Sequence, residues 1–252
     1  MGLIGGSLGY GILRTIAKEP PPRSSEVSQS DSFKLDQYFG SELSAAIAGK
    51  TVIDFGCGDG VQAVAMARMV PDCRVIGLDI QERFLDMGRK RADRAAVSDR
   101  CRFMTHTDEQ ADVIVSIDAF EHFEDPLAIL HLMAGLLKPG GEVLASFGPT
   151  WLHPYGGHLF SVFPWAHLLF SEQALIRWRA NFRNDGAQCF SQVDGGLNQI
   201  RISDFERMVD ASPLMIDWME TVPIRQVKAF RWKPLREFGT SIVRCRLTHR
   251  PT

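Results

Sequence analysis

A short glycine-rich turn between an apolar run and a helical pattern constrains this chain most. Residues 52–60 read Val-Ile-Asp-Phe-Gly-Cys-Gly-Asp-Gly, and residues 61–69 follow with helical spacing. Gly56, Gly58 and Gly60 allow a tight turn in which no Cβ blocks a ligand. Their spacing differs from the dinucleotide fingerprint, which disfavours a pyrophosphate-binding loop. The segment predicts a strand, a ligand-binding turn and a helix.

Apolar runs alternate with helical patterns over the next hundred residues, which indicates a parallel sheet covered on both faces. Two later runs predict an antiparallel pair of strands at one edge. The expected fold is α/β, a doubly wound, seven-stranded, mostly parallel sheet with an antiparallel C-terminal edge. The expected strands are residues 51–55, 74–80, 102–104, 112–117, 142–147, 214–222 and 241–248.

Three segments organise the chain. Residues 1–32 contain a short glycine-rich apolar stretch and a Pro- and Ser-rich stretch, and are expected to form a flexible or loosely docked arm and a linker. Residues 33–252 form the expected domain. Within it, residues 149–200 break the strand–helix rhythm and predict a cap insertion after the fifth strand, of the kind that usually carries function. Tyr38 belongs to a segment with helical spacing, which is expected to pack on the domain or to close over a site.

Charge and cysteine content narrow the class of protein. The net charge of -2 disfavours a general binder of nucleic acid or membrane surfaces. Basic residues gather from Arg225 onward, either as a solvated face or as a site for a phosphate or carboxylate. Five widely spaced cysteines predict a reducing, cytoplasmic location, and no stretch has the length of a membrane span.

Four motifs in order along residues 50–148 give the chain its resemblance. The glycine turn is followed by Gly-Leu-Asp-Ile ending at Ile80, by residues 112–126, and by residues 136–144. Together they resemble the class I, Rossmann-like S-adenosylmethionine-dependent methyltransferases. The Glu-His-x-x-Asp-Pro ending of the third motif is similar to the ubiquinone-biosynthesis-type subgroup.

The resemblance implies S-adenosylmethionine as cofactor. The glycine turn would lie against its methionine part, with Asp54 near the amine, and Asp79 would bind the ribose while Ile80 packs on the adenine. Thr105, His106, Thr107 and Asp108 are alternatives for the adenine amine. Asp54 could equally brace the turn. The expected cofactor-binding residues are Asp54, Gly56, Cys57, Gly58, Gly60, Asp79, Ile80, His106, Ser116 and Asp118.

Methyl transfer to a hydroxyl benefits from a general base, and histidine suits that role near neutral pH. His122 follows the fourth strand, at the edge where ligands collect in open α/β sheets. His153 and His158 follow the fifth strand at the same edge. We therefore treat His122, His153 and His158 as the possible catalytic residues.

Metal binding is a separate question. Our main interpretation includes no metal, because Glu121 and His122 can cap and brace the start of the next helix. The alternative is a divalent-metal site at Asp118, Glu121 and His122, completed by His153 or His158. This alternative comes from resemblance to methyltransferases that act on catechol-like or ribose hydroxyls.

The sequence therefore predicts a methyltransferase that modifies a small molecule, by O-methylation with general-base assistance. An enzyme acting on RNA or protein is one alternative, although the neutral charge disfavours a nucleic-acid partner. A non-catalytic, nucleoside-binding member of the fold is another.

Overall fold

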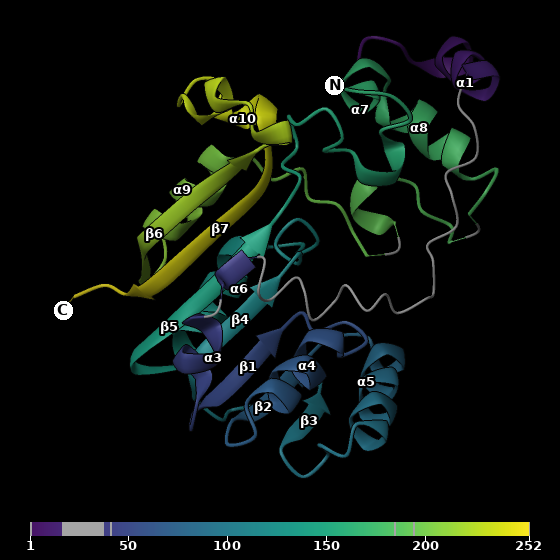
Figure 1. Cartoon of the computed structure of the whole chain (residues 1–252). Coiled ribbons are helices and arrows are strands. Elements are labelled where there is room, and N and C mark those ends of the chain that lie inside the picture. Colours follow the sequence, from purple (N-terminus) through teal and green to yellow (C-terminus); the bar gives the residue numbers. More distant parts are fainter. Residues whose placement is uncertain (1, 17–37, 41, 184, 194, 252) are drawn as a thin grey trace.

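The computed structural model describes residues 2–16, 38–40, 42–183, 185–193 and 195–251. Within these residues, seven strands form one sheet in the order β3-β2-β1-β4-β5-β7-β6 (Figure 1). The expected Pro- and Ser-rich linker, residues 19–32, lies outside the described residues. The strands are β1 (Thr51–Phe55), β2 (Arg74–Leu78), β3 (Cys101–Met104), β4 (Ala111–Ile117), β5 (Leu137–Phe147), β6 (Leu214–Pro223) and β7 (Thr240–His249).

Helices cover both faces of this sheet. One buried cluster joins α3, α4 and α5 to the sheet, and a second joins α6 and α9 to the opposite face. The strands that lie between the two layers are almost fully apolar, because neither face meets water. The helices of the domain are α3 (Glu42–Ile47), α4 (Val61–Met69), α5 (Glu82–Arg94), α6 (Pro126–Leu136), α9 (Ile202–Asp210) and α10 (Arg236–Gly239).

The direction of the strands confirms the expected fold class. The pairs β1–β2, β1–β4, β2–β3 and β4–β5 are parallel. Strand β7 is antiparallel to both β5 and β6, so the C-terminal edge is antiparallel as predicted. Between β6 and β7 the chain makes an excursion with two short 3₁₀ turns, η3 (Ile224–Gln226) and η4 (Lys228–Arg231).

The first-turn backbone N–H groups of helix α9 have a different hydrogen-bond partner from the one that the sequence predicts. The sequence predicts Ser203 as its N-cap, with Glu206 completing a capping box. The helix instead begins at Ile202, and the carboxylate of Glu237 accepts hydrogen bonds from the backbone N–H groups of Ile202 and Ser203. Glu206 forms an ion pair with Arg236. The prediction was wrong because the capping carboxylate comes from a distant segment.

The cap over residues 149–200 has its own buried cluster, which includes Trp151, Phe160 and Trp178. Its elements are η1 (His158–Phe160), α7 (Ala166–Leu169), α8 (Glu172–Arg179) and η2 (Phe190–Gln192).

Helix α1 (Gly6–Ile16) corrects the expectation of a flexible or loosely docked arm. Leu13 of α1 is fully buried in the cap cluster, and the backbone of Ile4 bonds to Leu169 and Ser171. The N-terminal segment therefore packs against the cap (Figure 1). No helix in the described part of the chain has the length and apolar character that crossing a bilayer requires.

Candidate active site

The glycine turn after β1 opens one face of the backbone to a ligand. Gly58 adopts a positive φ of 52°, and a Cβ built there would meet nothing within 4 Å. Gly60, with a φ of 78°, is different, because a Cβ there would come within 2.5 Å of the Phe103 ring. Gly58 thus leaves room for a bound group, whereas Gly60 allows α4 to start against Phe103.

Two carboxylates brace this turn. Asp79 accepts backbone hydrogen bonds from Gly58 and Gln81, at 3.0 and 2.8 Å. Asp54 is 2% exposed and is held by the backbone of Ala63 in the first turn of α4. Its Oδ2 atom is buried and has no hydrogen-bond partner among the described residues. Burial raises the pKa of Asp54 to about 7, with a smaller contribution from the negative charge of Asp79.

Cys57, also in the turn, is buried, and its thiol is not activated as a nucleophile. Burial raises the pKa of its thiol, and the neighbouring Asp54 and Asp79 carboxylates raise it further. The side chain remains a thiol and fills space beneath the turn.

A cavity of about 350 Å³ lies at the carboxyl ends of β1, β2 and β4. Its position follows the rule that ligands bind at this edge of an open α/β sheet. The sequence-predicted residues that line it are Gly56, Asp79, Ile80, His106, Asp118 and His122. Among the described residues, those predicted for the site but not lining this cavity are Asp54, Cys57, Gly58, Gly60, Ser116, His153 and His158.

The cavity also has an apolar wall that the sequence did not predict. Phe84 lies at the start of α5, Phe123 follows the β4 turn, and Leu132 lies on α6. Thr105 and Thr107 line the cavity beside His106, whereas Asp108 does not. The apolar residues had a helical pattern that is equally typical of core packing, so the sequence offered no signal to separate them.

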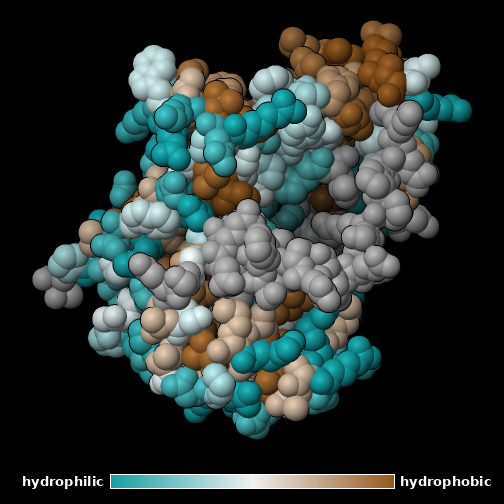
Figure 2. All heavy atoms as spheres, viewed as in Figure 1, coloured by the Kyte–Doolittle hydropathy of each residue, from teal (hydrophilic) through white to brown (hydrophobic). Residues whose placement is uncertain are grey.

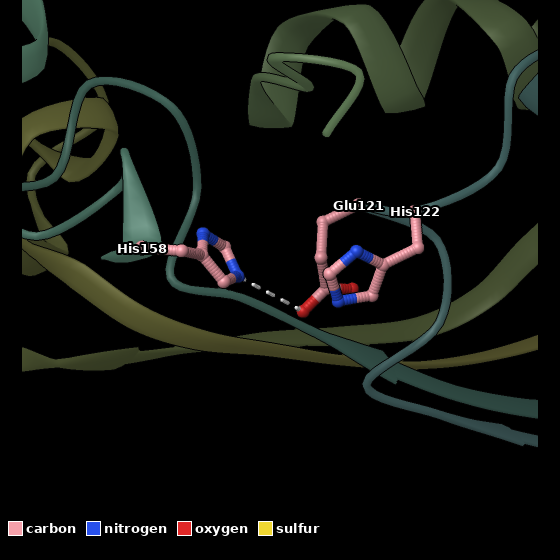
Figure 3. Close-up of side chains that lie close together, drawn as sticks. All are labelled: Glu121, His122 and His158. Atoms are coloured by element: carbon pink, nitrogen blue, oxygen red, sulfur yellow. Dashed lines mark ion pairs between the residues drawn. The ribbon is translucent and has the colours of Figure 1, made fainter. Parts of the chain in front are cut away.

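Glu121, His122 and His158 form a cluster next to this cavity (Figure 3). One ligand atom of each residue lies within 4.8 Å of those of the other two. His158 Nε2 is 3.9 Å from Glu121 Oε1, and the two histidine rings are 5.5 Å apart. Glu121 is 2% exposed, and its Oε2 atom has no hydrogen-bond partner among the described residues.

Backbone carbonyls fix the protonation pattern of both histidines. His122 Nδ1 is 2.8 Å from the Gly196 carbonyl, and His158 Nδ1 is 2.9 Å from the Gly156 carbonyl. A carbonyl oxygen only accepts, so each Nδ1 carries the proton and donates it. Each neutral ring therefore has its lone pair on Nε2, where it can accept a proton or bind a cation.

The turn that carries this cluster corrects one expectation. Glu121 and His122 lie before helix α6 and do not cap it. The Asp125 side chain is the N-cap and accepts a hydrogen bond from Ala128 N. Glu121 Oε1 instead accepts from the backbone N–H of Gly148, which ties the β4 turn to the end of β5.

Asn198, in the last part of the cap, holds the same turn from the other side. Its amide donates to the carbonyls of Phe120 and Phe123, at 2.6 and 2.8 Å. The Asn198 backbone N–H also donates to the Glu121 carbonyl at 3.0 Å. The cap is thus coupled directly to the turn that presents Glu121 and His122.

Tyr38 approaches the site from the N-terminal side. Its hydroxyl hydrogen-bonds Asp118, and Arg244 donates to its backbone carbonyl at 2.8 Å. Burial raises the pKa of Tyr38, and the carboxylates of Asp118 and Glu121 raise it further. Tyr38 is therefore a neutral hydroxyl beside two acids.

His153 lies elsewhere in the cap. Its Nδ1 accepts from Tyr155 N at 3.1 Å, which leaves Nε2 to donate toward Ser241 Oγ at 3.4 Å. Burial, together with smaller contributions from His167 and His158, lowers the pKa of His153 to about 4. Both ring nitrogens are used within the fold, so the structure separates His153 from the other two histidines.

Residues 53–145 match the family model described as "Methyltransferase domain". This part of the chain is therefore similar to the methyltransferase domain family. The match covers the cavity's glycine turn and Asp79 as well as the β4 turn, and it ends before the cap.

The chain is also similar to two curated relatives over part of their length. The chain is 35% identical over 124 residues to a "Ubiquinone biosynthesis O-methyltransferase" of Salmonella enteritidis PT4, which covers 44% of this chain and 50% of the relative. It is 35% identical over 101 residues to a "Ribosomal protein L11 methyltransferase" of Photobacterium profundum, covering 40% and 34%. The matches thus span about half or less of these relatives.

A solved structure extends the likeness to the whole fold. The magnesium protoporphyrin IX methyltransferase of Synechocystis PCC 6803, solved with bound S-adenosylmethionine, superposes with a TM-score of 0.54 at 15% identity. The superposition covers 97% of this chain and 92% of that one. At this identity it shows that the two chains share an overall fold, including the regions outside residues 53–145.

Proposed function

We propose that the chain is an S-adenosylmethionine-dependent methyltransferase that O-methylates a small molecule, with His122 as general base. The observation that carries the proposal is the position of His122, which lines the cavity while its Nδ1 donates to the Gly196 carbonyl, so that its Nε2 can accept a proton. When bound, S-adenosylmethionine supplies a methyl group on a positively charged sulfur, so the protein mainly positions the acceptor and excludes water.

The glycine turn and the cavity beside it fit this cofactor. Gly58 leaves open backbone for the methionine part, and Asp79 retains acceptor capacity for ribose hydroxyls beyond its two backbone bonds. Ile80 is 89% exposed and Phe84 lies beside it, which provides an apolar surface for the adenine. We assign His106, Thr105 and Thr107 to the adenine edge.

His122 would act on the acceptor hydroxyl. His122 Nε2 would take the proton of the acceptor hydroxyl, while the cofactor, when bound, would supply the methyl group. The Gly196 carbonyl holds the other ring nitrogen, which keeps Nε2 directed at the site. We assign Asp118, with Tyr38 bonded to it, to the wall beside the reacting groups.

A divalent cation is a second possibility, which one specific observation favours. The buried carboxylate of Glu121, whose Oε2 has no hydrogen-bond partner among the described residues, lies with ligand atoms of His122 and His158, and both histidines donate one ring nitrogen to a carbonyl. This oxygen-and-nitrogen set fits a divalent metal, and such backbone bonds are typical of metal-binding histidines. A metal there would polarise the acceptor oxygen and lower its pKa.

Two further alternatives concern the acceptor. The similarity to a relative named as a ribosomal protein methyltransferase keeps a protein acceptor open. The partly enclosed, mostly apolar cavity and the cap favour a small molecule. A non-catalytic, nucleoside-binding role would not require a histidine, His122, oriented in the cavity by a backbone carbonyl.

Cofactor binding and catalysis can be tested separately. S-adenosylhomocysteine is expected to raise the melting temperature of the purified chain, whereas NAD is not. Absence of a shift with S-adenosylhomocysteine would refute the proposal as a whole.

Catalysis would then be measured on a panel of small phenols and catechols. His122→Gln is expected to lower kcat/KM by about 100-fold while S-adenosylhomocysteine binding is retained. His131→Gln, at an exposed position on α6, is the matched control. Activity abolished by a chelator and restored by Mg²⁺ or Mn²⁺ would favour the cation over the simple base, and chelator-resistant activity would exclude it.

A further inference from the structure

The excursion between β6 and β7 is a strongly basic surface segment. Residues 224–235 contain four basic side chains and no acid. Arg225, Lys228, Arg231 and Lys233 are all exposed. Because like charges repel, such a cluster lowers stability unless an anionic partner neutralises it.

The fold itself neutralises little of this charge. Arg231 lies 3.9 Å from Glu220, which also pairs with Arg244. No ion pair joins Arg225, Lys228 or Lys233 to any of the residues that the structure describes. Glu237, the first acid after the segment along the chain, is engaged elsewhere because its carboxylate caps α9.

Large apolar side chains are interleaved with these charges. Trp232 is 66% exposed and Val227 is 43% exposed, within the same twelve-residue segment. Basic side chains beside exposed aromatic rings are typical of surfaces that meet the interfacial region of a bilayer, where the ring sits at headgroup level.

Helix α1 carries the complementary feature, an exposed apolar stripe. Leu13 faces the cap, while Leu8 and Ile16 of the same helix are 72% and 57% exposed. Leu3, just before the helix, is 93% exposed. Residues 2–16 contain no acid and one base, Arg14. The helix therefore packs with one face and still presents apolar side chains to solvent.

Both features lie at the same end of the molecule. Helix α10 and the neighbouring excursion project at the top of Figure 1, and so do α1 and the cap. Figure 2 shows hydrophobic side chains gathered over α1 at the upper right and hydrophilic ones over the excursion at the upper left. Helices α4 and α5 occupy the opposite end (Figure 1).

We infer that this end of the molecule docks on an anionic lipid bilayer. The basic excursion meets the negative headgroups, and Trp232 together with Leu3, Leu8 and Ile16 enters the interfacial layer. Charge complementarity decides the partner: a nucleic acid would use the basic half and leave the apolar stripe exposed, whereas an anionic bilayer uses both. The inference does not depend on the proposed chemistry.

Co-sedimentation of the full chain with vesicles tests the inference. We expect binding to vesicles of phosphatidylcholine with phosphatidylglycerol, weakened by added salt, and much less binding to phosphatidylcholine alone. Replacing Arg225, Lys228 and Lys233 together by Gln is expected to weaken partitioning by roughly 100-fold, at about fivefold per charge. Leu8→Ser with Ile16→Ser is expected to weaken binding at unchanged net charge.

A matched control removes three charges from the opposite end, as Arg68→Gln, Lys90→Gln and Arg94→Gln on α4 and α5. This control is expected to bind vesicles nearly as well as the parent chain. All variants are compared after their melting temperatures with S-adenosylhomocysteine confirm folding. Failure to bind anionic vesicles, equal losses in the control, or binding to single-stranded RNA but not to vesicles would each overturn the inference.

Discussion

Asp54 tests how the glycine turn after β1 is built. Its carboxyl is buried, one oxygen bonds the backbone of Ala63, and the other has no partner among the described residues. Burial raises its pKa from 3.8 to about 7. The folded state therefore keeps a proton that the unfolded state has already released over this pH range.

The sign and size of the effect follow from these two values. A group whose pKa is raised by folding lowers the free energy of unfolding as pH rises from the unfolded pKa to the folded one. For Asp54 the loss begins near 3.8 and is complete above about 7. Between about pH 5 and about pH 8 the parent chain is expected to lose about 3 kcal/mol from this residue.

Urea unfolding of the ligand-free chain at these two pH values measures the loss. Asp54→Asn keeps the size of the side chain and an acceptor for Ala63 N but cannot ionise, so its stability is expected to change about 3 kcal/mol less across the interval. Other titrating groups are common to both proteins and cancel in the comparison. Parallel pH dependences for parent and variant would refute the reasoning, because they would show that Asp54 ionises freely in the folded state.

Three further substitutions probe single contacts, each read by melting temperature and chemical unfolding. Asn198→Ala removes the amide that binds two carbonyls of the β4 turn, and it is expected to lower the free energy of unfolding by about 2 kcal/mol and to lower activity. A variant as stable as the parent would show that the cap does not hold the turn. Gly60→Ala places a Cβ 2.5 Å from the Phe103 ring at a positive φ, and it is expected to lower the free energy of unfolding by about 3 kcal/mol or more. A loss below about 1 kcal/mol would argue against this packing. Glu237→Ala removes the cap of α9 and is expected to cost about 1 kcal/mol, with Glu124→Ala as an unchanged control.

Local signals in the sequence predicted the sheet and the glycine turn. The tight turn requires glycine at Gly56, Gly58 and Gly60, and Asp79 follows at the tip of the next strand. Because short backbone segments set these requirements, the sequence alone reveals them. The antiparallel edge was also predictable, because it needs only two strand patterns after the last crossover.

Contacts between distant segments were not predictable in the same way. His153 and His158 looked equivalent in the sequence, and only the fold of the cap brings His158 to Glu121 and turns His153 toward Ser241. The glycines of the N-terminal segment suggested flexibility. In the structure Gly9 instead lets α1 approach α8, since a Cβ there would lie 3.2 Å from the Ala174 methyl group.

The strand order has a consequence for synthesis on the ribosome. Strand β7 lies between β5 and β6, so β6 has no neighbour in the sheet until Thr240–His249 has left the exit tunnel. During that interval the nascent chain exposes an open edge of β5 and an unpaired β6, both able to pair with another chain. The interval between synthesis of β6 and synthesis of β7 is therefore a period of high aggregation risk, and chaperone contacts are expected to concentrate on nascent chains that have completed β6 but not β7.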